Sequence, residues 1–404
     1  MNSSDTNLDK DHFRSQGQQL AVISLISAGH FISHFYVICL APLYIAMSKD
    51  LGVGFAELGL ISSGFFIAGA TLQMPAGLLV DRIGAKRVLF VGMFLLSLSV
   101  TLAGLTNSYW SLLILFMFAG AGNCVFHPCD YVIMSSSIDE KKLGRAFSIH
   151  SFSGSAGFFA VPLVMPFLME LTNWQNALFI VGVCGLLIVS VIFLLQNFLS
   201  DTASRQKQPA GQLSRTRDAL LTKRILSHFV YFITSSAATS ALGGLTIVVL
   251  VSYYGVSEKL AGLILLAYLI AASVGVITGG FIADKTKRHN FVLVVTMLIA
   301  TLVTGIAALG IIDFWACVGM LVIAGLTKGI VAPSRDLMVR NDAPPTLLGG
   351  VVAFVTIGFT IGNGAAPAIA GWLVDLGSPL NVFWFAAAMS LAAICCLLVA
   401  YEKI

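Results

Sequence analysis

Twelve long apolar segments, separated by short polar stretches, constrain this chain more than any other feature of its sequence. They run over about residues 18–47, 55–80, 88–107, 110–136, 145–170, 174–198, 224–254, 257–283, 290–311, 314–340, 347–375 and 379–401. Each reaches or approaches the ~20 residues with which an α-helix crosses the hydrocarbon core of a bilayer. Because lipid offers no water to backbone polar groups, we predict an all-α membrane protein of twelve transmembrane helices.

Composition and charge agree with this class. Hydrophobic residues make up 57% of the 404 residues and charged residues only 10%, whereas soluble domains carry about a quarter charged residues. The seven cysteines lie in apolar segments, without the spacing of a disulfide framework or a metal site. Nearly all the lysines and arginines outside the segments share one side with both termini, and only Lys49 and Lys259 fall on the other. We therefore predict cytoplasmic termini, and the net charge of +4 needs no nucleic-acid partner.

The chain divides into two halves that repeat each other. We predict a tail at residues 1–17 without a signal peptide, a six-helix half at 18–198, a cytoplasmic linker at 199–223 and a second half at 224–404. A shift of 205 residues aligns glycines and prolines of the fourth and fifth segments with those of the tenth and eleventh. The aligned pairs are Gly120 with Gly325, Pro128 with Pro333, Gly144 with Gly349, Gly157 with Gly362, and Pro162 with Pro367. Parallel repeats of this kind place a solute site near the midplane, between the halves.

A charged, glycine-containing turn follows the second segment and returns after the eighth. It reads Gly77-Leu-Leu-Val-Asp81-Arg82-Ile-Gly84-Ala-Lys86-Arg87 and then Gly279-Gly280-Phe-Ile-Ala-Asp284-Lys285-Thr-Lys287-Arg288. We expect Gly77 and Gly280 to let two helices approach closely, and Gly84 to take a positive φ. The acids would bind a helix N-terminus or an arginine that a conformational change releases. The expected switch residues are Gly77, Asp81, Arg82, Gly84, Arg87, Gly280, Asp284 and Arg288; a plain basic loop with an incidental acid is the alternative.

The first of these turns resembles the signature between the second and third spans of the major facilitator superfamily, and residues 280–288 resemble its weaker second copy. The resemblance implies two six-helix halves around a central cavity, with alternating access and with the first, fourth, seventh and tenth spans lining the cavity. Residues 28–36, 120–128 and 144–157 also resemble the branch that includes fosmidomycin-resistance-type proteins. The fifth segment lacks the glycine–proline pair of drug antiporters, which argues against export.

Ionisable residues at membrane depth carry the most functional information, because each costs about 2.5–3.5 kcal/mol at a helix centre on insertion scales. We predict that solute is bound by Lys328, His30, His34, Tyr36 and Asn123. We predict that proton coupling or gating uses Asp130, His127, His150, Arg335 and Asp336. Histidine suits proton coupling because it titrates near physiological pH, although a membrane histidine is often only a hydrogen-bonded packing residue.

Two of these predictions concern charge partners. Lys328 has no acid within a helical turn, so it meets a solute anion, meets an acid of another helix such as Asp130, or is buried as a neutral amine. Asp130 and Arg335 occupy equivalent positions of the two halves, and we expect them to form a cytoplasmic gate. The alternative is that Arg335 pairs with the neighbouring Asp336 or with lipid phosphate.

The sequence thus predicts a secondary transporter that moves a small carboxylate or phosphonate with protons, and the family resemblance implies a bacterial inner membrane. A drug or metabolite efflux antiporter is the main alternative, and a transporter of metal chelates is a minor one. His30, His34, His127, His150 and Asp130 are acceptable transition-metal ligands, but we expect them at different depths, which argues against one compact site. Neither a phosphate-binding loop nor a nucleophile with its base is evident, so we predict no enzyme, no cofactor and no resident metal. We expect a monomer in the bilayer.

Overall fold

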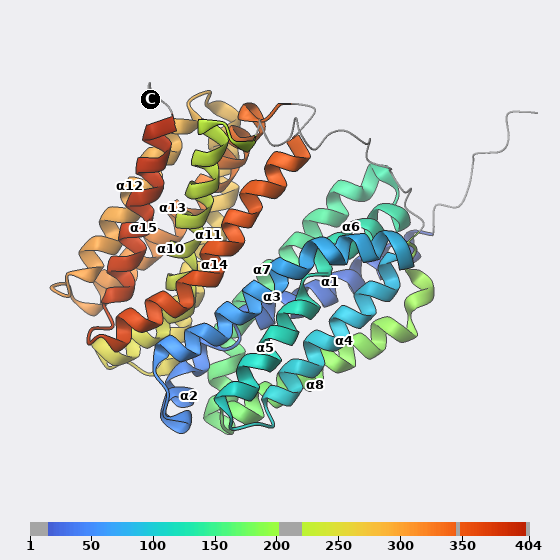
Figure 1. Ribbon diagram of the computed structural model, residues 1–404, viewed down its shortest axis with the longest axis horizontal. Helices are drawn as coiled ribbons and strands as arrows, with labels where there is room; N and C mark the ends of the chain where they lie inside the picture. Colours follow the sequence, from blue (N-terminus) through green and yellow to red (C-terminus); the bar gives the residue numbers. More distant parts are fainter. Residues whose placement is uncertain (1–14, 202–219, 345–347, 401–404) are drawn as a thin grey trace, which may run out of the picture.

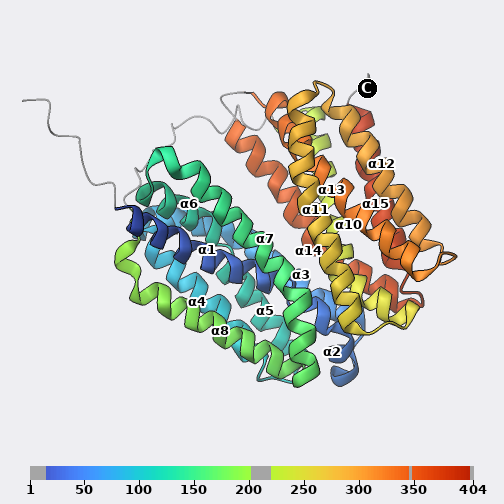
Figure 2. The same cartoon turned by 180° about the vertical axis from the view of Figure 1, so that it is seen from behind.

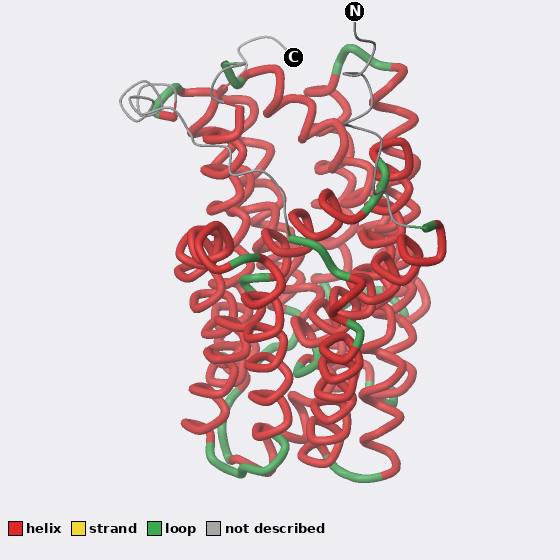
Figure 3. Tube along the Cα trace, turned by 90° about the vertical axis from the view of Figure 1, so that its right-hand side faces the viewer, coloured by secondary structure: helices red, strands yellow, loops and turns green. Residues whose placement is uncertain are grey.

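The computed structural model describes residues 15–201, 220–344 and 348–400. Its described part is helical throughout, with short connecting loops and no β-strand (Figure 3). Twelve spans are long and apolar enough to cross a membrane, and the prediction of a twelve-helix membrane protein is confirmed. Each helix satisfies its own backbone hydrogen bonds, so bulky apolar side chains can remain exposed on the outside of the molecule, where lipid covers them.

The N-terminal half contains six spans, two of which are built from more than one helix. Its elements are α1 (Gln16–Ile38), η1 (Ala41–Leu43), α2 (Tyr44–Leu51), α3 (Phe55–Ile83), α4 (Ala85–Ala103), α5 (Tyr109–Asn123), α6 (Phe126–Ser137), α7 (Glu140–Leu171), α8 (Trp174–Leu194) and η2 (Gln196–Phe198). The first span breaks before Pro42, whose ring cannot continue a regular helix. The fourth breaks at Cys124 and Val125, between α5 and α6.

The C-terminal half repeats the arrangement with six unbroken helices. They are α10 (Lys223–Tyr254), α11 (Glu258–Lys285), α12 (His289–Ala308), α13 (Phe314–Asp342), α14 (Leu348–Asp375) and α15 (Asn381–Ala400). The beginnings of α1 and α10 and the ends of α8 and α15 lie at one end of the molecule, which we call the linker end (Figure 1). The opposite end, where α2 lies, is the far end.

Glycines at equivalent positions make the same close helix contacts in both halves. A side chain on Gly120 of α5 would collide with the backbone of Phe65 on α3, and one on Gly325 of α13 would collide with the backbone of Tyr268 on α11. Gly157 of α7 likewise lies against α1, and Gly362 of α14 against α10. Because small residues let backbones approach within lipid, the glycine repeat in the sequence is a repeat of packing.

The two halves contact each other toward the far end, and their ribbons diverge toward the linker end (Figure 1). Two symmetry-related helix pairs make this junction, α3 with α14 and α7 with α11, the second of which is seen from behind in Figure 2. In the first pair, a side chain on Gly59 would collide with the backbone of Pro367. In the second, a side chain on Gly262 would collide with the carbonyl of Pro162. At both contacts, a glycine of one half thus packs directly against the backbone of a proline in the other half.

Charge strengthens the junction at the far end. The carboxylate of Asp375, at the end of α14, accepts hydrogen bonds from the backbone N–H groups of Phe55 (2.9 Å) and Ala56 (2.7 Å), which begin α3. An acid at a helix N-terminus is stabilised both by these unpaired donors and by the helix dipole. The ammonium of Lys259 also donates to Glu170 across the halves, at 3.3 Å, but both side chains are exposed.

The charged turns lie at the linker end and only partly match their predicted roles. Gly84 has φ +93°, which confirms the expected positive φ. Gly77 and Gly280 do not bring helices together, since a side chain on either would meet nothing within 4 Å; in the second turn the close contact is made by Gly279, against Ile330. That prediction was wrong because the halves are apart at this end. Arg82, Arg87, Asp284 and Arg288 are exposed, and the side chain of Asp81 lies outside the described part.

We predict that Asp375→Ala loosens the far end. The substitution removes two charge-assisted hydrogen bonds, worth about 1–2 kcal/mol together. The population of molecules whose far end is closed, relative to those whose far end is open, should therefore fall roughly 5- to 30-fold. The measurement is the distance between spin labels on Lys49→Cys and Leu376→Cys, in a background free of the native cysteines.

The matched control is Glu170→Gln, which removes the exposed cross-half ion pair at the same end. Exposed pairs contribute about 0–1 kcal/mol, so its distance distribution should stay close to that of the parent. Equal distributions for Asp375→Ala and the parent would show that the Asp375 cap does not hold the halves together.

Candidate functional site

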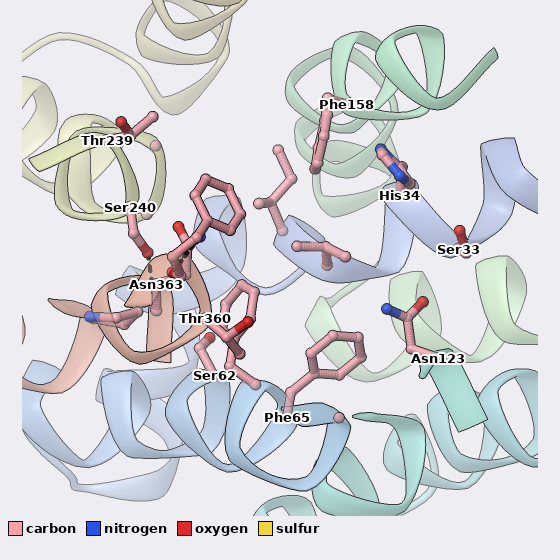
Figure 4. Close-up of a pocket in the computed structure, with 18 of the residues that line it drawn as sticks. Ser33, His34, Ser62, Phe65, Asn123, Phe158, Thr239, Ser240, Thr360 and Asn363 are labelled. Carbon is pink, nitrogen blue, oxygen red and sulfur yellow. Dashed lines mark hydrogen bonds between the residues drawn. The ribbon is translucent and has the colours of Figure 1, made fainter. Parts of the chain in front are cut away.

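A cavity of about 450 Å³ lies between the halves, midway along their helices. The N-terminal half supplies residues of α1, α3 and the break between α5 and α6, and the C-terminal half supplies residues of α10, α11 and α14. Polar side chains from the two halves approach it from opposite sides (Figure 4). Its polar lining consists of Ser33, His34, Tyr44, Ser62, Gln73, Asn123, His127, Thr239, Ser240, Tyr268, Thr356, Thr360 and Asn363.

The cavity is polar without formal charge. Among its described lining residues there is no lysine, arginine, aspartate or glutamate, and the remaining wall combines aliphatic and small residues with five phenylalanines, Phe65, Phe66, Phe126, Phe158 and Phe359. The Oδ1 atom of Asn123 is buried and has no hydrogen-bond partner in the described protein. Hydroxyl and amide groups of this kind fix the orientation of a bound small molecule, while aromatic faces bury its apolar surface.

Sequence reasoning missed most of the C-terminal lining, because uncharged residues carry little signal inside an apolar segment. The repeat would have located some of it. Asn363 is shifted by 205 residues from Phe158, and both line the cavity. Phe65 and Tyr268 also line it, and they meet Gly120 and Gly325, the glycines that the same shift pairs. The repeat of 205 residues was therefore the signal in the sequence that could have located these residues.

At the cavity wall and behind it, the histidines and the aspartate that lie at membrane depth in the N-terminal half form one compact group, which we call the histidine cluster: His30, His34, His127, Asp130 and His150. The Nδ1 atom of His30 lies 3.6 Å from Oδ2 of Asp130, and Nε2 of His150 lies 3.5 Å from the same oxygen. The His30 ring centroid is 4.3 Å from that of His34 and 5.6 Å from that of His127. The expectation that these residues lie at different depths was wrong.

Three helices supply the side chains of the histidine cluster, and a glycine leaves the space that they occupy. A helix places residues four apart on one face, so α1 presents both His30 and His34. The break before Phe126 starts α6 where His127 and Asp130 point toward α1. From α7 comes His150, and one turn further along lies Gly154, where a Cβ would come 2.7 Å from Nε2 of His30 and 3.0 Å from Cε1 of His34. Gly154 thus leaves the room that the two imidazoles fill.

The predicted site residues therefore divide by location. His34, His127 and Asn123 line the cavity, whereas His30, Asp130 and His150 are buried behind it. Tyr36 lies away from both, because its hydroxyl donates to the carbonyl of Val181 at 2.8 Å inside the N-terminal half. Its position gives Tyr36 a packing role, and we do not carry it forward as a solute ligand.

The cations of α13 are also placed by the structure. The ammonium of Lys328 donates a hydrogen bond to the backbone carbonyl of Ser235 on α10. Arg335 donates to Asp336 at 2.8 Å and lies 4.6 Å from the centre of the Phe232 ring. Asp130 contacts neither of the two cations, since it is buried in the histidine cluster. The expected gate between Asp130 and Arg335 is therefore not formed in this state of the molecule.

We predict that Gly154→Ala destabilises the protein by about 1–3 kcal/mol, the usual cost of overfilling a packed interior. The new methyl group would lie within 3.0 Å of ring atoms of both His30 and His34. Thermal unfolding in detergent, followed by tryptophan fluorescence, measures the change. Gly144→Ala is the control in the same helix, since a Cβ there meets nothing within 4 Å. Equal unfolding temperatures for the two variants would contradict the prediction.

Comparisons with known proteins agree with this architecture. The sequence profile of the Major Facilitator Superfamily matches residues 26–248 and 225–403. A probable L-galactonate transporter of Escherichia coli is 24% identical over 180 residues, which cover 44% of this chain and 40% of that protein. The probable nitrate transporter NarT of Staphylococcus epidermidis is 25% identical over 78% of this chain and 81% of its own. The fosmidomycin resistance protein of Escherichia coli is 22% identical over 88% and 86%, respectively.

Among solved structures, a bacterial homolog of the human lysosomal transporter Spinster, in an inward-facing and occupied conformation, has a TM-score of 0.78. It is 15% identical, and the match covers 96% of this chain and 97% of that one. At this identity the likeness shows the fold, which is the major facilitator fold of two six-helix halves predicted from the sequence. With its profile matched over most of its length, the chain belongs to the Major Facilitator Superfamily and is a multi-pass membrane transporter.

Proposed function

We propose that this transporter moves a small hydroxylated organic anion by alternating access. The observation that carries the proposal is the cavity at mid-span, to which both halves contribute residues. In the described part, the main contacts between the halves lie on the far-end side of this cavity. A rocking motion that opened the far end and closed the linker end would expose the same cavity to the other side of the membrane.

The positions of the basic residues support a cytoplasmic linker end. Most basic residues of the described part that are near helix ends lie at this end, and among these described residues only Lys49 and Lys259 lie at the other. By the positive-inside rule, the linker end then faces the cytoplasm of a bacterial cell, and the structure represents an inward-facing state. The solved Spinster homolog, whose fold is similar, was captured in that state.

Lys328 supports an anionic solute. It is equivalent by the 205-residue shift to Asn123, which lines the cavity. The carbonyl of Ser235 that Lys328 contacts also accepts a hydrogen bond from Thr239, at 2.9 Å, and Thr239 lines the cavity too. Lys328 itself is not a lining residue, but it shares this carbonyl with one, and no carboxylate of the described protein pairs with its ammonium. A solute carboxylate there would gain a charge-assisted hydrogen bond.

The rest of the lining supports hydroxyl groups on the solute. Asn123, Asn363 and Gln73 offer amides, and several serines and threonines offer hydroxyl groups that both donate and accept. Two of the relatives are named for L-galactonate and for nitrate, both of which are anions. A hydroxylated acid such as a sugar acid would use the neutral polar wall and Lys328 together.

Efflux of a drug or metabolite is the second candidate function. The aromatic wall favours it, because aromatic rings also bind lipophilic compounds, and one relative is named a fosmidomycin resistance protein. A thermal-stabilisation panel separates the two candidates, since any ligand of the folded state raises the unfolding temperature. Hydroxylated carboxylates should stabilise the purified protein, and lipophilic cations should not.

We predict that Lys328→Ala removes this stabilisation by carboxylates. A hydrogen bond to a charged group contributes about 1.5–3 kcal/mol, so the dissociation constant should rise roughly 10- to 100-fold. Lys328→Arg, which keeps the charge, should retain part of the affinity. Lys259→Ala is the control, since Lys259 pairs with Glu170 at the far end and away from the cavity. If carboxylates raised the unfolding temperature of Lys328→Ala as much as that of the wild type, Lys328 would not be a solute ligand.

Liposomes containing the protein test the transport step itself. Saturable counterflow of the stabilising solute would identify a carrier, whereas ohmic conductance would identify a channel. Coupling to protons stays a prediction from the sequence, and uptake driven by an imposed pH gradient in the same vesicles measures it.

A further inference from the structure

The histidine cluster presents more unpaired buried polar atoms than any other part of the described protein. Both carboxylate oxygens of Asp130 are buried without a hydrogen-bond partner, and so are the Nδ1 atoms of His30, His34 and His150. An unpaired buried polar group costs free energy, and within a membrane span the cost is high. The unpaired carboxylate of Asp130 and the unpaired Nδ1 of His30 that faces it indicate a ligand outside the chain; for His150 the nitrogen that faces the carboxylate is Nε2, not the unpaired Nδ1.

The separations in this group do not fit hydrogen bonds between the side chains. Oδ2 of Asp130 lies 3.6 Å from His30 and 3.5 Å from His150, whereas nitrogen–oxygen hydrogen bonds extend to about 3.2 Å. Elsewhere in this chain, His228 and Asp342 show the ordinary geometry, with Nε2 and Oδ2 2.9 Å apart. The carboxylate of Asp130 therefore faces two imidazoles without bonding to either.

The same separations suit two ligands of one metal ion. With metal–nitrogen and metal–oxygen bonds of about 2.0–2.2 Å, neighbouring ligands of a tetrahedral ion lie about 3.3 Å apart. One ligand atom each from His30, Asp130 and His150 lies within 4.8 Å of the other two. These three residues come from α1, α6 and α7. The rings of His30 and His150 are stacked, with their centroids 3.9 Å apart, so binding one ion requires the two imidazoles to turn apart until a nitrogen of each faces it.

We propose that His30, Asp130 and His150 bind a divalent transition-metal ion. Two imidazoles and one carboxylate select a first-row transition metal rather than magnesium or calcium, which prefer all-oxygen ligands. The ring centroid of His34 is 4.3 Å from that of His30, but its nitrogens are not within the group of mutually close ligand atoms, so His34 would have to move to become a fourth ligand. The carboxylate also offsets part of the ion's charge within the membrane span.

The site adjoins the solute cavity. His34 and His127 line the cavity, and the rings of both contact the ring of His30. One imidazole therefore separates the site from the solute cavity, and an ion entering from the cavity would have to displace it. This site goes beyond the proposed solute site, since its three ligands His30, Asp130 and His150 do not line the cavity and do not depend on which solute the cavity carries.

Metal binding to the purified, tag-free protein in detergent tests the proposal. We expect one Zn²⁺ per chain by isothermal titration, and visible absorption bands of low-symmetry Co²⁺ when cobalt is the probe. Asp130→Asn and His150→Ala should each weaken Zn²⁺ binding by on the order of 100-fold or more, because outer-shell changes alone cost 10–100-fold. His289→Ala is the matched control, since His289 begins α12 in the other half.

The wild-type measurement alone can overturn the proposal, even if a variant fails to fold. Absence of saturable Zn²⁺ and Co²⁺ binding would overturn the metal site. Equal binding by the wild type and a folded Asp130→Asn variant would place the metal elsewhere. Neither readout uses the transported solute. Failure of the metal site therefore leaves the proposed transport function standing, and failure of the proposed transport function leaves the metal site standing.

Discussion

Inside a bilayer no water is available for a polar group, and the rest of this structure depends on that constraint. The backbone meets it by forming helices through every described span. The few polar side chains at depth must find each other or a ligand: Tyr36 bonds to Val181, Lys328 to Ser235, and Arg335 to Asp336. Those of the histidine cluster do not find enough partners, and that shortage makes the cluster the most informative part of the molecule.

Close contact between bare backbones provides the framework in which this happens. Equivalent glycines hold α5 on α3 and α13 on α11, and further glycine contacts join the halves at the far end. Helices packed this closely move as rigid bodies more readily than they deform. The carboxylate of Asp375, at the end of α14, adds two hydrogen bonds to the first residues of α3. Both can break together when the halves rock apart at the far end.

The two halves share a packing pattern but have different chemistry. The N-terminal half carries the histidines and a buried carboxylate, whereas the C-terminal half carries Lys328 and Arg335 on α13. A solute in the shared cavity would therefore meet imidazoles from one half and a cation near the other. Asn123 and Lys328 occupy equivalent positions, so this difference arises from substitutions within one repeated scaffold.

The sequence by itself determined the twelve spans, the two halves, the positive φ of Gly84 and the polar residues that lie at membrane depth. Each of these follows from local properties: segment length, a repeat spacing or the freedom of one glycine. Only the tertiary structure decided that His30, Asp130 and His150 meet, that Tyr36 faces its own half, and that Gly279 rather than Gly280 makes the close contact. The reason is that the rotation of each helix about its axis, and its shift along its neighbour, are set by packing between segments far apart in the chain.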